Sequence, residues 1–104
     1  MIKGKSLPTT EYILPLQYNK IPFLEKRLVR EQYIKEQKGL CMYCNGDLDI
    51  EPPKAILDKK IDWNKFPRNF RESNIHLQHC HKTGMTEGAV HMYCNAVLFI
   101  YENR

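Results

Sequence analysis

Two stretches of this chain are nearly identical: CMYCN at residues 41–45 and HMYCN at residues 91–95. Each begins with one zinc-binding side chain and carries a second three positions later. Structural zinc sites take four thiolate or imidazole ligands in a tetrahedron, and ligands separated by two residues reach one ion from a tight turn. We therefore predict one structural zinc site made by both stretches. The predicted ligands are Cys41, Cys44, His91 and Cys94.

Two alternatives stay open for these side chains. The cysteines could be ordinary buried residues, and Cys80 could replace His91 as the fourth ligand. We favour His91 because Cys80 lacks a second potential ligand at the spacing that both repeated stretches share, with two residues between the ligands.

The distance between the two halves of the predicted site is unusual, since 46 residues separate Cys44 from His91. Common zinc fingers enclose about 12–20 residues, so the intervening chain is expected to have its own role.

Length, composition and charge limit the classes of protein to consider. The chain has 104 residues, which predicts one small domain, and 42% hydrophobic residues are enough for a packed core. Its net charge of +4 is compatible with a polyanionic partner. No apolar run could span a bilayer, and the N-terminus lacks the apolar region of a signal peptide. We therefore expect a cytoplasmic protein, in which four cysteines indicate metal binding more than disulfides.

The clearest predicted element is a helix over residues 22–39. Pro22 suits the first helical position and Gly39 suits the position just beyond the end. An apolar stripe is predicted on this helix from residues spaced four apart: Leu24, Leu28, Val29 and Tyr33. Before the helix we expect an extended arm over residues 1–20, with one short strand at Tyr12–Leu16.

The rest of the chain is predicted to be irregular and then to form a hairpin. Residues 45–73 contain Asn-Gly and Pro-Pro turn signals and read as a loop. Residues 74–81 read as a strand, 82–88 as a turn with two glycines, and 89–93 as a returning strand. The apolar run after Asn95 is too short for its periodicity to decide between a helix and a strand. If it is a helix, Asn95 would also suit its N-cap.

Three of the four histidines lie together in HLQHCHKTG, residues 76–84. His79 and His81 would point to the same side of a strand. An imidazole can accept a proton from water near neutral pH, so this pair is a candidate for acid–base chemistry. A histidine-rich surface strand or an adventitious metal site is the alternative, and we interpret His76 as a surface strand residue.

From Cys41 onward the chain resembles the HNH (His-Me finger, ββα-metal) nuclease superfamily, and most closely the phage recombination endonuclease VII family. That family's pattern is a helix ending in C-x-x-C, a spacer, and then D-H-D-H-x-T-G-x-x-x-G-x-x-C-x-x-C-N. Residues 78–95 here read QHCHKTGMTEGAVHMYCN. The resemblance covers residues 39–46 and 74–100. The matching positions are His79, His81, Thr83, Gly84, Gly88, Cys94 and Asn95.

The resemblance implies a small α+β fold: a zinc-stabilised ββα-metal nuclease domain over residues 39–104, preceded by an N-terminal arm and helix over residues 1–38. It implies a metal-dependent DNA endonuclease that leaves 5′-phosphate and 3′-hydroxyl ends. His79 would be the general base, His81 would contact the phosphate, and Asn95 would hold a catalytic magnesium or manganese ion. Gln78 stands where the family has an aspartate for this ion, and Cys80 replaces a second aspartate. Glutamine offers only a neutral oxygen, which weakens the expected site.

DNA is the expected partner, in the cytoplasm of a bacterial or phage-infected cell, and a symmetric homodimer is left open. Between residues 54 and 71 six basic side chains are interleaved with aromatic ones, which favours phosphate contacts and base stacking. The alternative for this segment is a solvated loop. A catalytically weakened or inactive zinc module that binds nucleic acid is the second functional reading, and a zinc domain for protein partners is the third. The residues expected to contact DNA are Lys65, Arg68, Arg71 and Lys82.

Overall fold

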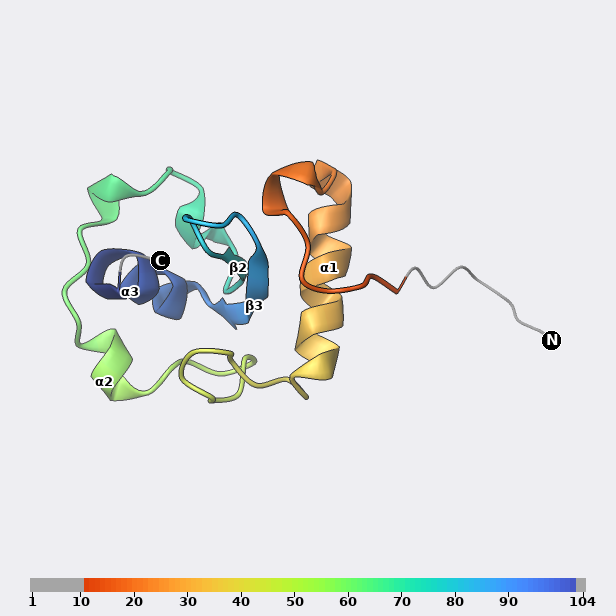
Figure 1. The fold of residues 1–104 in the computed structure, drawn as a ribbon. Helices are drawn as coiled ribbons and strands as arrows, with labels where there is room; N and C mark the ends of the chain where they lie inside the picture. The colour runs from red at the N-terminus through yellow and green to blue at the C-terminus, as the bar shows by residue number, and fades with distance from the viewer. Residues whose placement is uncertain (1–10, 103–104) are drawn as a thin grey trace.

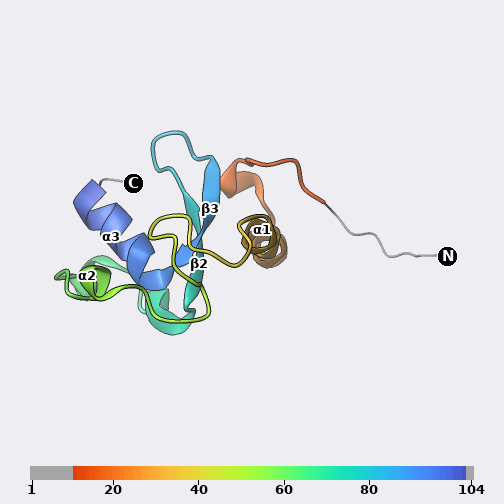
Figure 2. The same ribbon diagram turned by 90° about the horizontal axis from the view of Figure 1, so that it is seen from below.

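A two-stranded antiparallel sheet lies at the centre of the fold, in a computed structural model that describes residues 11–102. Strand β2 (Ile75–His79) pairs with β3 (Thr86–His91), and helix α3 (Met92–Glu102) follows β3 without a break. Helix α1 (Phe23–Glu36) packs on one side of the sheet and α3 on the other (Figures 1 and 2). The predicted α+β class is confirmed.

Helix α1 confirms the prediction for residues 22–39 with slightly shorter bounds. Pro22 is its N-cap residue, and Gly39 has a φ of +78° just beyond its end, a conformation that glycine adopts without strain. The predicted apolar stripe is only half right. Val29 and Tyr33 are buried, whereas Leu24 remains 80% exposed. A sheet of two strands covers only a narrow face of the helix, so the neighbouring apolar face is left uncovered.

The segment before α1 does not contain the strand that was predicted at Tyr12–Leu16. Instead, Gln17 forms an isolated antiparallel bridge with Met85, and a single 3₁₀ turn, η1 (Tyr18–Lys20), leads into α1. Pro15 has no N–H group and cannot extend a ladder of backbone hydrogen bonds, which explains why pairing stays so short. The part of the expected extended arm before residue 11 lies outside the described residues.

Residues 45–73 are largely irregular, as predicted, but contain three single-turn helices. These are α2 (Lys54–Leu57), η2 (Trp63–Lys65) and η3 (Phe70–Glu72). Buried Ile56 anchors α2 to the core beside α3. The aromatic side chains of this segment pack on one another, with ring centroids of Phe66 and Phe70 4.3 Å apart.

The hairpin is present, but its turn is earlier and shorter than predicted. Strand β2 ends at His79, and Gly84 N donates to Cys80 O at 2.7 Å, closing a turn that returns the chain to β3 at Thr86. The run after Asn95 is a helix, which resolves the open choice. Because α3 begins at Met92, Asn95 lies within its first turn and is not its N-cap.

The core lies on both faces of the sheet and is small. Its fully buried aliphatic side chains come from α1, β3 and α3, so these elements hold the hairpin in place. None of the described helices has both the length and the apolar character that crossing a bilayer requires. The largest fully buried aliphatic residues are Val29, Val90, Val97 and Leu98.

A candidate metal centre and the cleft beside it

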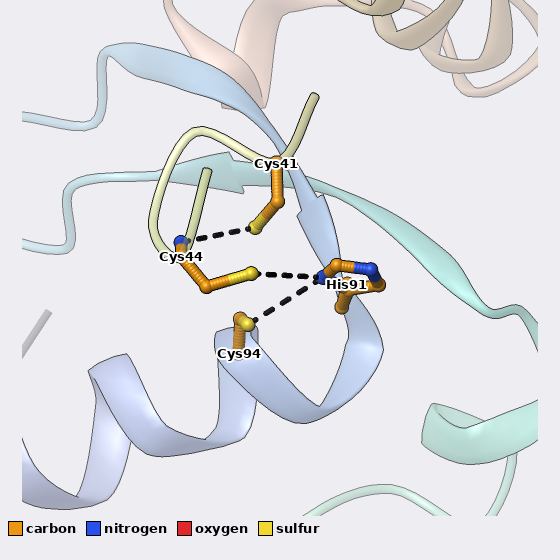
Figure 3. Close-up of side chains that lie close together, drawn as sticks. All are labelled: Cys41, Cys44, His91 and Cys94. Carbon is orange, nitrogen blue, oxygen red and sulfur yellow. Dashed lines mark hydrogen bonds between the residues drawn. The ribbon is translucent and has the colours of Figure 1, made fainter. Parts of the chain in front are cut away.

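The two repeated stretches meet in space and bring four potential metal ligands together (Figure 3). The first two come from the loop after α1, the third ends β3, and the fourth lies in the first turn of α3. Their ligand atoms all lie within 4.8 Å of one another, a spacing that could hold a structural metal such as zinc. Cys80 is not part of this group, so the alternative ligand set is not supported. The group consists of Cys41, Cys44, His91 and Cys94.

The first stretch forms a tight turn whose backbone N–H groups point at sulfur. Cys41 N donates to Gly46 O at 2.7 Å, and Asn45 has a φ of +65°, which asparagine tolerates better than most residues. Cys44 N and Gly46 N lie 3.5 and 3.4 Å from the sulfurs of Cys41 and Cys44. Such donors stabilise thiolates, the form of cysteine that binds metal. The interpretation of Asn45-Gly46 as a turn is therefore confirmed.

His91 is fixed from both sides of its ring. It is 3% exposed, and its Nε2 atom lies 2.9 Å from Asp47 O and 2.8 Å from Ile50 O. Carbonyl oxygens only accept hydrogen bonds, so Nε2 carries the proton and Nδ1 keeps its lone pair. That lone pair faces the sulfurs of Cys44 and Cys94, at 3.4 and 3.6 Å (Figure 3). A metal-binding histidine is typically oriented in this way, so the donor chemistry fits zinc.

The three thiols also influence one another's ionisation. The hydrogen bond from Cys94 lowers the pKa of the Cys41 thiol to about 4, and the same contact, with burial, raises the pKa of Cys94. Burial raises the pKa of Cys44 as well. Negative charge on one sulfur therefore discourages ionisation of its neighbours. A dication would relieve this repulsion, because its positive charge offsets most of the negative charge of three thiolates and favours their ionisation.

A cleft of about 760 Å³ runs along β2, between α1, α3 and the loop around residues 65–73. Three of the residues predicted to be catalytic, His79, His81 and Asn95, line this one cleft, and His76 joins them. His76 and His79 belong to β2, His81 lies in the turn after it, and Asn95 lies in the first turn of α3. The metal cluster includes His91 at the end of β3 and Cys94 in the first turn of α3. Asn95 follows Cys94 directly, so the same turn of α3 contributes to both the cluster and the cleft.

His79 lies under an aromatic ring in this cleft. Its imidazole is stacked on Tyr18, with ring centroids 3.9 Å apart and planes 15° apart, and its centroid is 4.7 Å from that of His81. Burial lowers the pKa of His79, the positive groups of His81 and Lys26 lower it further, and Glu87 acts in the opposite direction. The imidazole is therefore the neutral, proton-accepting form at pH 7.

Asn95 is oriented by a residue that the sequence did not single out. Its Nδ2 lies 3.0 Å from Nδ1 of His76, and since an amide NH₂ only donates, His76 accepts. His76 is half-buried with its ring edge against Phe70, and burial lowers its pKa. His76 is a strand residue, as interpreted, but it is half-buried and does not lie on the open surface. In the sequence, only its place three residues before His79 on the same predicted strand could have indicated that His76 belongs to the cleft.

Gln78 lies in the floor of the cleft and is 1% exposed. Its amide nitrogen donates to His79 O at 2.9 Å and to Glu87 Oε1 at 3.4 Å. The amide is thus held within the hairpin, beside a one-residue irregularity in the β2–β3 register between Gln78 and His79. Position 78 adds no charge to the cleft. Its role as a metal ligand stays a prediction.

The walls of the cleft are basic, and none of the described residues that line it is acidic. Of the four residues predicted to contact DNA, only Lys65 lines the cleft. Arg71 lies over the ring of Trp63 at 4.7 Å, and Arg68 and Lys82 are exposed elsewhere. Residues 20–38 carry six basic and three acidic side chains, but the sequence alone does not show which side of α1 faces the cleft. The basic residues of α1 that line it are Lys26, Arg27 and Arg30.

The chain matches no protein-family model, no curated protein and no solved structure. The chemical capacity of the site therefore rests on its own residues.

Proposed function

We propose that this protein is a metal-dependent DNA endonuclease that hydrolyses phosphodiester bonds in the cleft along β2. One observation carries the proposal: a neutral, half-buried His79 lies with His81 and Asn95 in a cleft whose charged walls are all cationic. A polyanion is the ligand that such walls attract. The resemblance of residues 78–95 to the HNH pattern, which assigned the roles of these side chains, is consistent with the proposal.

His79 is the proposed general base. Its lowered pKa leaves the imidazole free to take a proton from a water molecule that attacks the phosphorus atom. His81 is next to it, with ring centroids 4.7 Å apart, and would contact the scissile phosphate. The basic side chains of α1 would bind phosphates on either side. By the resemblance, the products would carry 5′-phosphate and 3′-hydroxyl ends.

The residues of the cleft fit a divalent cation that is held only in part by protein. Magnesium or manganese, when bound, would stabilise negative charge on the phosphate and on the leaving 3′ oxygen. Asn95 offers an amide oxygen, because its nitrogen is already directed at His76. Magnesium commonly keeps several waters and takes substrate phosphate oxygens as ligands. We therefore expect Asn95 and the DNA itself to hold the ion, with low affinity in the absence of DNA.

A second function has an observation in its favour. No described acidic residue lines the cleft, and carboxylates are the usual protein ligands of magnesium. The same cationic walls without an effective metal site would make a zinc-containing module that binds nucleic acid and does not cut it. The zinc-bearing cluster would have the same structural role in both cases.

One experiment separates these two functions. Zinc-loaded protein is incubated with supercoiled, linear and four-way-junction DNA, with magnesium or manganese, and both binding and cleavage are measured. His79→Ala is the test variant. Cys80→Ser is the matched control, because Cys80 is adjacent in sequence but lines neither the cleft nor the metal cluster. Nuclease activity predicts cleavage by the wild type and the control and none by His79→Ala, with binding retained in all three.

Two results would contradict the nuclease. Cleavage that survives His79→Ala would remove His79 as the base. Tight binding of DNA by the wild type with no cleavage in any metal would favour the binding module instead. A symmetric dimer stays a prediction that sedimentation of the same preparation tests.

A further inference from the structure

The segment Leu16–Lys20, which we call the strap, crosses the end of the hairpin and closes one side of the cleft. It lies outside the residues that resemble the HNH pattern. Thr86 N donates to Leu16 O at 2.8 Å, and Tyr18 N donates to Gly84 O at 2.8 Å. Leu16 N also donates to Thr86 Oγ1 at 2.9 Å, and this buried hydroxyl is 2.8 Å from Tyr33 OH of α1. The strap is thus tied to both the hairpin and α1.

The turn of the hairpin is shaped to accept the strap. Gly84 has a φ of +79°, and a Cβ atom there would lie 2.5 Å from Oε1 of Gln17. Gln17 in turn donates from Nε2 to Thr83 O at 3.1 Å. Glycine at position 84 therefore serves the docking of the strap as well as the turn itself.

Docking of the strap places Tyr18 flat against His79. The two rings are nearly parallel, with centroids 3.9 Å apart, and Lys26 Nζ of α1 lies 4.1 Å from the centroid of the same tyrosine ring. Tyr18 and His79 both line the cleft. The stack is between residues 61 positions apart in sequence, so only the docked strap brings them together.

His79 has a particular need for such a support. It is the last residue of β2, and the β2–β3 register is irregular immediately before it. Regular sheet packing therefore does not extend beyond it to fix the imidazole plane. A general base must hold its nitrogen within hydrogen-bond reach of the attacked water, and misplacement by 1 Å can cost about a hundredfold in rate.

We propose that Tyr18 is a positioning residue for His79, and that the strap is part of the catalytic site. The inference rests on the proposed function for its effect on rate, but the placement of His79 can be measured without DNA or a catalytic metal. Tyr18 acts through its ring, since the ring face is the part that contacts His79.

The test compares Tyr18→Leu with Tyr18→Phe in the full zinc-loaded chain. The ring current of Tyr18 should shift the His79 ring protons upfield in NMR spectra. We expect Tyr18→Leu to abolish this shift and to lower kcat about tenfold to a hundredfold, with a smaller change in KM. Tyr18→Phe keeps the ring and should keep the shift and kcat. Tyr12→Leu is the matched control, because Tyr12 lies in the same N-terminal segment and contacts Glu25, not His79.

Three results would overturn the role proposed for Tyr18 or limit it. An unchanged His79 shift in Tyr18→Leu would show that the stack does not form and would overturn the proposal. A lost shift with unchanged kcat would overturn the positioning role, and an equal loss of kcat in Tyr12→Leu would reduce Tyr18 to a general structural part. If the wild type cuts no DNA while its His79 shift depends on Tyr18, the proposed function fails and the Tyr18-dependent placement of His79 stands.

Discussion

Single residues in this protein are held by partners far away in sequence. His91 shows this most clearly, because the carbonyls of Asp47 and Ile50 fix the proton on Nε2 and so direct Nδ1 toward the sulfurs. The spacing of the repeat predicted His91 as a ligand. It could not predict the two carbonyls, since they belong to a loop whose path is set by packing of Leu48 and Ile56 into the core.

Replacement of His91 tests the ligand set. His91→Cys replaces the imidazole with a thiolate, which also binds zinc, and should keep one zinc per chain. His91→Ala leaves three ligands and should lower zinc affinity by at least about tenfold. Zinc content after dialysis against a graded chelator, measured by mass spectrometry, gives the comparison. Cys80→Ser should retain zinc fully, and loss of zinc in that control together with retention in His91→Ala would contradict the assignment.

The two half-buried histidines of the cleft predict how stability depends on pH. Burial lowers the pKa of both His76 and His79 below the ordinary value of 6.5. Between 6.5 and those lower values the unfolded chain binds more protons, so the free energy of unfolding falls as the pH decreases through this window. Above 6.5 their contribution is constant. NMR titration should give midpoints below 6.5 for both rings.

A variant separates this effect from acid release of zinc. His76→Phe removes one of the two titrating groups and should show a shallower loss of stability on acidification than the wild type, both measured with zinc present. Midpoints at or above 6.5, or an identical pH dependence in the variant, would contradict the burial of these side chains.

At the level of elements, local signals were enough to predict α1, the hairpin and the loop between them. Pro22 and Gly39 mark the ends of α1, and alternating residues around two glycines mark the hairpin. The side of α1 that is buried and the packing of the strap on the hairpin were not predictable, because both depend on contacts between elements. Leu24 was expected on the apolar stripe of the helix and is exposed, and the strand expected at Tyr12–Leu16 did not form. No local pattern indicates that Tyr18 reaches His79.

Two glycines test how tightly α1 is attached to the hairpin. Gln37, at the C-cap of α1, accepts from Ala89 N and donates to Ala89 O, each at 2.9 Å. A Cβ on Gly88 would lie 2.7 Å from Gln37 Oε1 and 3.0 Å from Met42 Cγ, whereas one on Gly39 would meet nothing within 4 Å. Gly39→Ala should cost about 1–2 kcal/mol from its positive φ alone. Gly88→Ala should cost about twice as much, because its φ of +158° also disfavours a side chain and because overpacking and disrupted hydrogen bonds are added.

Urea unfolding of the two alanine variants, with zinc bound, gives the comparison. Equal losses of stability would mean that Gln37 moves aside freely and that the attachment of α1 is looser than its hydrogen bonds indicate.

For the whole molecule, the distribution of charge matters more than its total. The net charge of +4 is modest, but three cationic side chains of α1 and one from the loop converge on a cleft in which no described lining residue is acidic. Electrostatic binding of DNA depends on the number of phosphates neutralised at the site, and the salt dependence counts them. Charges remote from the cleft should contribute little.

Two surface ion pairs of the same kind provide a matched test. Arg27 pairs with Glu31 and Lys54 with Asp58, both at i,i+4 spacing and at 2.9 and 2.8 Å, but only Arg27 lines the cleft. Loss of either exposed pair should change stability by less than about 1 kcal/mol. Arg27→Gln should weaken DNA binding and reduce the slope of log affinity against log salt by about 0.9, and Lys54→Gln should leave both unchanged. Equal effects would place DNA elsewhere on the surface.

The metal cluster should decide whether the molecule folds at all. It joins the loop after α1 to the junction of β3 and α3, across 46 intervening residues, while the two-stranded sheet alone offers little core. Structural zinc contributes about 10–16 kcal/mol in small zinc domains, and a domain's total stability is about 5–15 kcal/mol. We therefore expect a strong chelator to abolish the dispersed NMR spectrum, and zinc, but not magnesium, to restore it. A native spectrum from protein shown to be zinc-free would mean that the apolar core suffices for folding.

Removal of magnesium alone should leave the fold intact and stop any cleavage, because the proposed catalytic ion is held by Asn95 and the DNA and supports no part of the fold.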